Sequence, residues 1–171
     1  MPDTAEILLR LLGAFYMFAG VVAARAALTS RFADTVIAAI DGSRTPLAER
    51  RKSAWLIGAA AIVFAGGLVL ALGIDAARWL FLASAAGQAL YLFALAPGYF
   101  DKADAPDAQG RRQTTNAFVV YVAATALVWW GAATGKLAPL AEAHPAVLAA
   151  AAAGIVAYLG YIARHTIFGL R

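Results

Sequence analysis

The sequence predicts an all-α fold, an integral membrane bundle of five transmembrane helices plus one amphipathic helix at the membrane interface. Three observations lead to this prediction. Hydrophobic residues make up 63% of the 171 residues and charged residues 14%, with a mean hydropathy of +0.72, which is not the composition of a soluble domain. The apolar residues form blocks close in length to the ~20 residues that a helix needs to cross ~30 Å of hydrocarbon. Basic residues gather on one side of these blocks.

The two central spans, residues 53–74 and 77–97, carry the clearest signal. Only a short polar turn, residues 75–78, separates their apolar segments, so the two helices must run antiparallel. Gly73 provides a natural stop for the first helix, and Asp75 is placed to cap the second.

The other three spans are residues 7–27, 114–135 and 145–163, which complete one membrane domain over residues 1–171. The uncharged core of the first of them has only 14 residues, between Arg10 and Arg25. Long arginine side chains can extend toward the headgroups, so this helix can still span.

Residues 29–41 are too short to cross a membrane and too amphipathic for a plain loop. Phe32, Val36, Ile37 and Ile40 share one helical face, and the opposite face is polar. We expect a helix lying at the interface, or a continuation of the first helix along the membrane surface.

Counting Lys and Arg on the two sides of five spans gives eleven against three. All loops are short, which is the condition under which the positive-inside rule applies. The sequence therefore predicts an N-terminus outside and a C-terminus in the cytoplasm, in the cell's inner (plasma) membrane. The larger group is Arg25, Arg31, Arg44, Arg50, Arg51, Lys52, Lys102, Arg111, Arg112, Arg164 and Arg171, and the smaller is Arg10, Arg78 and Lys136.

Several kinds of chemistry are disfavoured. There is no Cys, which excludes thiolate catalysis and Cys-ligated metal or Fe–S centres. The spans contain no carboxylate, so a proton relay or cation pump built on buried Asp or Glu is not expected. His144 and His165 fall on opposite faces in the predicted topology and make a poor metal site. No catalytic motif is present, and the basic residues follow membrane orientation rather than nucleic-acid binding.

Neutral polar residues at matched depth are the candidate site. One interpretation is interhelical hydrogen bonding that fixes the packing, in which Gln88 is satisfied inside the bundle. The other is a pocket for a small lipophilic ligand such as a quinone, whose carbonyls would accept hydrogen bonds. The candidates are Tyr16, Ser84, Gln88, Tyr91, Tyr121, Thr125 and Tyr158.

Small residues also repeat along three of the spans, where they would let helix backbones approach closely. Inside the bundle this means packing, and on an outer face it would build an oligomer. The last span is the better candidate for an oligomer contact because it is terminal. The residues are Gly13, Gly20, Gly58, Gly66 and Gly73, and in the last span Ala150, Gly154, Ala157 and Gly160.

The segment from Leu8 to Gly20, followed by an amphipathic segment and a hairpin carrying residues 66–73, resembles the DoxX-like group of small membrane proteins over about the first 100 residues. The resemblance implies a quinone-associated redox role. DoxX-like proteins usually have four spans and often an acidic residue shortly before the Gly-Gly pair, where this chain has Val63 and a fifth span.

The sequence favours a non-enzymatic multi-pass protein that acts through a membrane partner or as a homo-oligomer. No cofactor is predicted on the residues alone. The alternatives are a DoxX-like quinone-associated redox component and a small transporter or channel. A transporter is disfavoured because no charged or Pro-broken mid-helix segment marks a substrate site.

Overall fold

The computed structural model describes residues 3–43, 46–100 and 108–167, and these form five helices long and apolar enough to span a membrane. The prediction of an all-helical chain with five such helices is confirmed. Arg44, Lys102 and Arg171, counted above for orientation, lie outside the described residues. The helices are α1 (Thr4–Ile40), α2 (Leu47–Ala71), α3 (Ala77–Leu90) with its π-helical continuation η1 (Tyr91–Phe100), α4 (Ala108–Ala133), the short 3-10 helix η2 (Leu140–Glu142) and α5 (Pro145–Ile167).

Of the two expectations for residues 29–41, the structure shows no separate interfacial helix, and residues 29–40 instead continue α1 without a break. The resulting helix has 37 residues, which is about 55 Å of length. No Gly or Pro interrupts this segment before Gly42, whose φ of +66° ends it. Phe32, Ile37 and Ile40 are exposed on this continuation, so its apolar face has no cover within the described chain.

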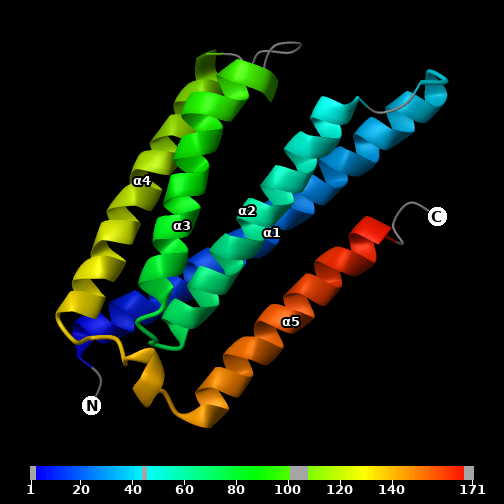
Figure 1. The fold of residues 1–171 in the computed structure, drawn as a ribbon. Coiled ribbons are helices and arrows are strands. Elements are labelled where there is room, and N and C mark those ends of the chain that lie inside the picture. The colour runs from blue at the N-terminus through cyan, green and yellow to red at the C-terminus, as the bar shows by residue number, and fades with distance from the viewer. Residues whose placement is uncertain (1–2, 44–45, 101–107, 168–171) are drawn as a thin grey trace.

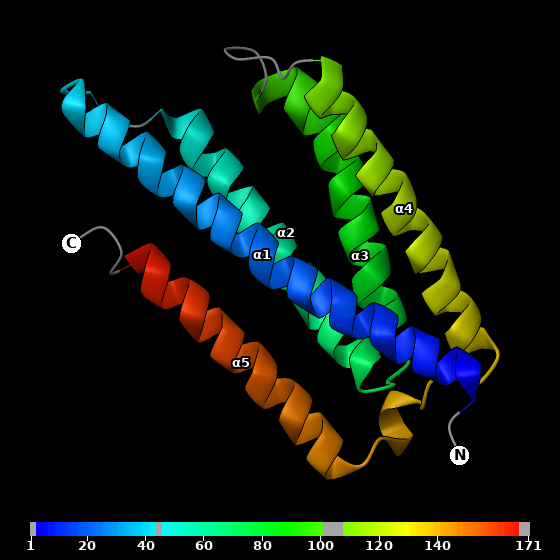
Figure 2. The same ribbon diagram turned by 180° about the vertical axis from the view of Figure 1, so that it is seen from behind.

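The helices form two antiparallel pairs and one single helix (Figures 1 and 2). α1 and α2 lie side by side along their length and make the most extensive helix contact. α3 and α4 meet this pair near the N-terminal end of α1 and diverge from it toward the other end, while α5 runs alongside α1 and α2. The pairs are therefore joined at one end and separated at the other.

Glycines allow the backbones of α1 and α2 to touch. A Cβ atom placed on Gly13 would lie 2.3 Å from the amide nitrogen of Ala71, and one on Gly20 would lie 2.7 Å from that of Phe64. A Cβ atom on Gly67 would lie 2.3 Å from the nitrogen of Met17. These approaches are closer than any side chain permits, so the close packing expected from small residues is present here.

Two hydrophobic clusters lie on different parts of the α1–α2 pair. One joins it to α3 and α4, with fully buried Leu9, Leu70, Phe81 and Val128. The other joins it to α5 and contains Ala24, Ala27, Ile57, Ala60, Phe64, Tyr158 and Ile162. The first cluster occupies only the end near the N-terminus of α1, and beyond this cluster α3 diverges from α2.

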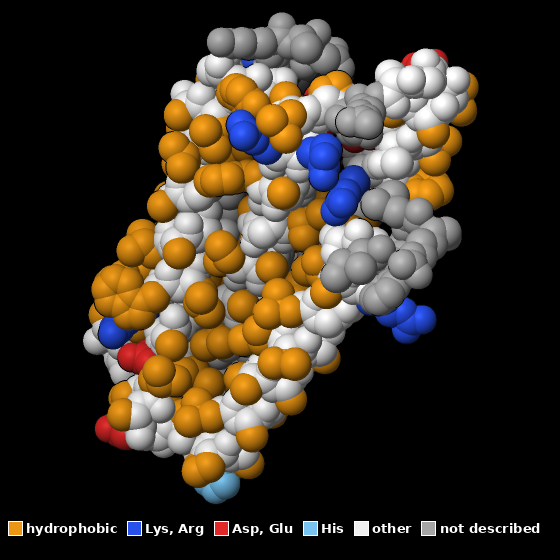
Figure 3. Space-filling model, turned by 45° about the vertical axis from the view of Figure 1, so that its right-hand side comes forward, with side chains coloured by type: hydrophobic (Ala, Val, Ile, Leu, Met, Phe, Trp, Pro, Cys, Tyr) orange, Lys and Arg blue, Asp and Glu red, His pale blue; other side chains and the backbone are white. Residues whose placement is uncertain are grey.

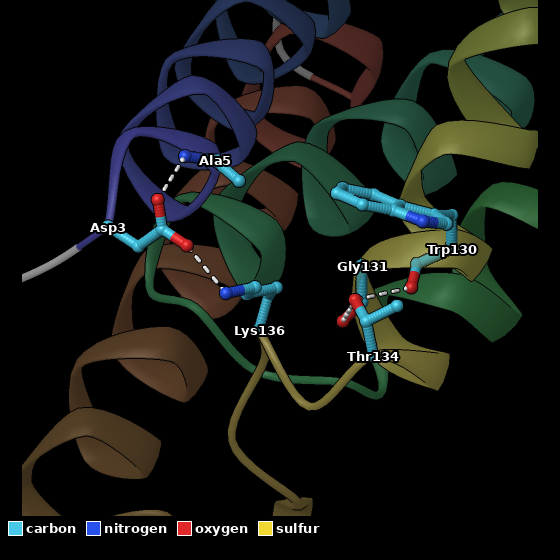
Figure 4. Close-up of polar contacts among 6 residues, drawn as sticks. All are labelled: Asp3, Ala5, Trp130, Gly131, Thr134 and Lys136. Carbon is cyan, nitrogen blue, oxygen red and sulfur yellow. Dashed lines mark hydrogen bonds and ion pairs between the residues drawn. The ribbon is translucent and has the colours of Figure 1, made fainter.

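Polar contacts hold the joined end together (Figure 4). Asp3 accepts hydrogen bonds from the backbone amide of Ala5 and from the ammonium group of Lys136, which ties the start of α1 to the segment after α4. Thr134 donates from its hydroxyl to the carbonyl of Trp130 at the end of α4.

The turn between α2 and α3 is bound to the same segment. Gly73, at φ +77°, ends α2 as predicted, and its carbonyl accepts a hydrogen bond from Ala138 at 2.8 Å. The prediction that Asp75 caps α3 is wrong, because that helix has no side-chain cap. Asp75 instead accepts from the amide of Leu140 at 3.0 Å and pairs with Arg78 at 3.5 Å. The carboxylate of Asp75 therefore connects the turn between α2 and α3 to the segment after α4.

Candidate functional site

The seven polar candidates fall into three places. Tyr16, Ser84, Gln88, Tyr121 and Thr125 gather where α1, α3 and α4 meet, Tyr158 lies between α5 and the α1–α2 pair, and Tyr91 lies on η1. Five of the seven candidate residues expected at matched depth therefore lie together.

The gathered tyrosines form an aromatic cluster with Phe81. The ring of Tyr16 meets the rings of Phe81 and Tyr121 edge to face, with centroids 5.3 and 5.0 Å apart. Phe81 and Tyr121 stack at 5.5 Å. All three residues are buried in the first hydrophobic cluster. Such ring contacts add roughly 0.5–1.5 kcal/mol each beyond area burial, so the cluster holds α1, α3 and α4 together.

Two polar members of the cluster, Gln88 and Thr125, donate hydrogen bonds within their own helices. Gln88 donates from its side-chain nitrogen to the hydroxyl of Ser84 at 3.1 Å, one turn away on the same helix. Thr125 donates to the carbonyl of Tyr121 at 2.9 Å, again within its own helix. Gln88 is half-buried, and this partner lies on its own helix, α3, whereas the interhelical interpretation expects a partner on another helix. The arrangement fits packing better than ligand binding.

Tyr158 and Tyr91 also make structural contacts. The hydroxyl of Tyr158 donates to the carbonyl of Gly20 at 2.8 Å, and its ring stacks on Phe64 with centroids 3.9 Å apart. This residue fastens α5 to α1 and α2. Tyr91 stacks on Phe100 at 5.8 Å, within η1.

A groove of about 770 Å³ separates α2 from α3 and η1 on the diverging side of the fold. This volume lies within the ~300–1,000 Å³ usual for small-molecule sites. Ser84 is the one predicted candidate that lines it. The α2 wall is formed by Ala54, Trp55, Gly58, Ala59 and Ile62, and the α3–η1 wall by Ala83, Ser84, Gly87, Leu95 and Phe100.

The groove exists because side chains fill the joined end and leave the diverging end empty. At Gly66 an added Cβ atom would lie 3.3 Å from Leu80 and from Phe81, so the large α3 side chains occupy that level. At Gly58 and Gly87 an added Cβ atom would meet nothing within 4 Å. Glycine therefore lies at a close helix contact at the level of Gly66 and in an open groove wall at Gly58 and Gly87.

One end of the groove carries its charged side chain. Arg51 lines that end and donates to the hydroxyl of Tyr99 at 3.3 Å. Figure 3 shows apolar side chains covering the helices on one face of the molecule, with Lys and Arg side chains gathered mainly toward the upper end. A molecule with an apolar body and a polar head matches this division.

The π-helical form of η1 brings Tyr99 to the groove. In a continuous α-helix, the twelve residues from Gly87 to Tyr99 would rotate the tyrosine about 120° away from the glycine, at ~100° per residue. A π-helix holds more residues per turn, and Tyr99 returns to the face of Gly87, since both line the groove. Pro97 lies inside the segment and cannot donate the usual α-helical hydrogen bond.

The sequence did not indicate that Arg51, Gly58, Gly87 and Tyr99 line a common groove. The small-residue pattern assigns Gly58 to packing and the charge distribution assigns Arg51 to orientation, and neither pattern includes Gly87 or Tyr99. The available signal was Pro97 inside an apolar run, which indicates a local change of helix geometry.

Comparison with protein-family models, with curated proteins and with solved structures returns no match to this chain. The fold defines only a class of protein, an all-helical chain with five helices able to span a membrane, consistent with a multi-pass membrane protein.

Proposed function

We propose that this protein is a non-enzymatic, multi-pass membrane component that takes up one amphiphilic molecule from the bilayer into the groove between α2 and α3. The observation that carries the proposal is the open, apolar groove of about 770 Å³, lined by two glycines whose missing side chains leave space. Its polar end, at Arg51, suits a head group, and its apolar length suits a hydrocarbon tail.

The test fills the groove from its own wall. Gly87→Leu and Gly58→Leu each place a side chain in the open space, whereas the control Ala126→Leu adds the same side chain to an exposed position on α4. Native mass spectrometry of protein purified in mild detergent should find one amphiphile retained per wild-type and Ala126→Leu chain, and less in both groove variants. Equal retention in all four proteins contradicts the proposal, and so does a wild-type chain that retains nothing.

The proposed orientation is an N-terminus outside and a C-terminus in the cytoplasm, in the cell's inner (plasma) membrane. The eleven-to-three distribution of Lys and Arg supports it. Reporter fusions after Leu140 and after Arg171 should report opposite compartments, with the fusion after Arg171 in the cytoplasm. A cytoplasmic signal after Leu140 would contradict this orientation.

A quinone is the second candidate occupant, as the resemblance to DoxX-like proteins implies. The hydroxyl of Ser84 on the groove wall favours it, because a hydroxyl can donate to a quinone carbonyl. The same mass spectra decide between the candidates, since a quinone and a phospholipid differ in mass. Loss of a retained quinone in Ser84→Ala would favour the redox role.

Homo-oligomerisation through α5 also stays a prediction. On this helix Gly154 packs against Leu68, but Gly160 meets open space, and Val156 and Leu159 are exposed. The mass of the intact assembly in the same spectra should be a multiple of the chain mass if α5 pairs, and a single chain mass would contradict the prediction.

A further inference from the structure

We propose that the occupant of the α2–α3 groove is an anionic phospholipid, with its phosphate at Arg51 and Tyr99 and an acyl chain along the groove. This inference rests on the proposed function, and it specifies the chemistry of the head group. It adds that charge, rather than apolar fit alone, selects the molecule that is bound.

The length of the groove matches one leaflet of a bilayer. Along α2 it extends from Arg51 to Ile62, eleven residues that span about 16 Å at ~1.5 Å per residue. Half of a ~30 Å hydrocarbon core is ~15 Å. A phospholipid whose head group lies at Arg51 would therefore reach the inner end of the groove with its chain.

The polar end has a positive charge, and none of the described residues that line the groove is acidic. Arg51 is the one charged residue among the described residues that line the groove. Lys52 and Glu49 belong to a separate polar cavity of about 270 Å³ between α1 and α2, together with Asp34. In the described chain, Arg51 donates only to the neutral hydroxyl of Tyr99.

The two side chains at this end can both donate to a phosphate. Arginine presents several N–H donors in a planar fork that suits phosphate oxygens. The hydroxyl of Tyr99 accepts from Arg51 at 3.3 Å, which leaves its own hydrogen available to donate. The bound group is therefore expected to be an acceptor with negative charge.

The absence of a carboxylate on the described walls favours an anionic over a zwitterionic head group. A zwitterionic lipid would bring an ammonium group next to Arg51, where the two positive charges repel. A free phosphate ion has no apolar part to occupy the rest of the groove. The anionic phospholipid satisfies both the charge and the apolar lining.

The experiment compares wild type, Arg51→Gln and the matched control Arg50→Gln. Arg50 is the adjacent, exposed arginine and does not line the groove. Delipidated protein is given equal amounts of phosphatidylglycerol and phosphatidylcholine with identical acyl chains, and bound lipid is counted by native mass spectrometry. Wild type and Arg50→Gln should prefer phosphatidylglycerol, and Arg51→Gln should lose this preference by about tenfold or more, as expected for a charge-assisted hydrogen-bond pair.

Other outcomes separate the two proposals. Equal binding of the two lipids by wild type, blocked by Gly87→Leu, would overturn the anionic head group and leave the groove as a binding site. Lipid binding unchanged by Gly87→Leu would overturn both. An equal loss of preference in Arg50→Gln and Arg51→Gln would mean a general surface attraction and overturn the specific contact. Competition by inorganic phosphate alone would assign the site to the free ion instead of the lipid.

Discussion

The contact between α1 and α2 makes a sharp prediction for Gly13. Gly13→Ala places a Cβ atom 2.3 Å from the amide nitrogen of Ala71 and 2.8 Å from the carbonyl oxygen of Gly67. Non-bonded atoms prefer ~3.5–4.0 Å, so the helices must separate by about 1.2–1.7 Å at this level. Both close atoms belong to the α2 backbone, so no side chain can rotate away to relieve the contact.

The cost follows from the rigidity of the contact. Overpacking a well-packed interior costs ~1–3 kcal/mol. We expect the upper part of this range, because separating the helices at Gly13 also loosens the backbone contacts at Gly20 and Gly67. A loss of ~2–3 kcal/mol lowers Tm by about 4–12 °C in a chain of this size.

Thermal unfolding in mild detergent, followed by circular dichroism, measures this loss. The control is Gly58→Ala, which also replaces a glycine inside α2 but meets no atom within 4 Å. Since alanine is favoured over glycine in a helix by roughly 0.5–1 kcal/mol, the control should melt at the wild-type temperature or slightly above it. If both variants melt together, the proposed backbone contact is refuted.

Two further predictions concern single polar contacts. Tyr158→Phe keeps the ring stack but removes the hydrogen bond to Gly20. The loss should cost ~0.6–2 kcal/mol and lower Tm by a few degrees. An unchanged Tm would show that this bond does not hold α5. The ion pair at the joined end should respond to pH: the hydrogen bond from Lys136 and that from the Ala5 amide lower the pKa of Asp3, and the hydrogen bond to Asp3 raises the pKa of Lys136. A lowered carboxyl pKa adds stability above the unfolded value of about 3.9 and loses it as pH falls through the folded pKa. The Tm difference between wild type and Asp3→Asn should thus be present at neutral pH and vanish in acid, and a difference that persists in acid would exclude the ion pair as its cause.

Hydropathy predicts the number and position of the helices well because burial in hydrocarbon demands long apolar segments, whatever their tertiary partners. It does not predict where α1 ends. The amphipathic pattern of residues 29–40 indicates that the surroundings of the chain change along this segment. The segment contains no residue that breaks a helix, so α1 continues to Ile40. Periodicity reports the environment of a segment, whereas helix ends depend on residues such as Gly42.

The groove was not predictable from one sequence, because it depends on which positions between α2 and α3 are left unfilled by side chains. Gly58 and Gly66 are alike in sequence, and only the packing of Leu80 and Phe81 distinguishes the filled level from the open one. The tyrosine cluster was predictable in part, since equal depth places Tyr16 and Tyr121 at the same level in antiparallel helices. Depth gives neither the rotation of a helix about its axis nor the helices it packs against, and Tyr158 lies elsewhere because α5 packs on another part of the α1–α2 pair.

The joined end of the two helix pairs has a mechanical consequence. The backbones of α1 and α2 touch at Gly13, Gly20 and Gly67, close to the joined end, so we expect the pair to tilt as one arm about Gly73. From Gly73 to Arg51 the arm is 22 residues, or about 33 Å. A rotation of one degree at the pivot therefore displaces the free end by about 0.6 Å, and five degrees by about 3 Å. Changes in bilayer thickness or lateral tension, which alter the tilt of spanning helices, would open or narrow the space beside Arg51 in direct proportion.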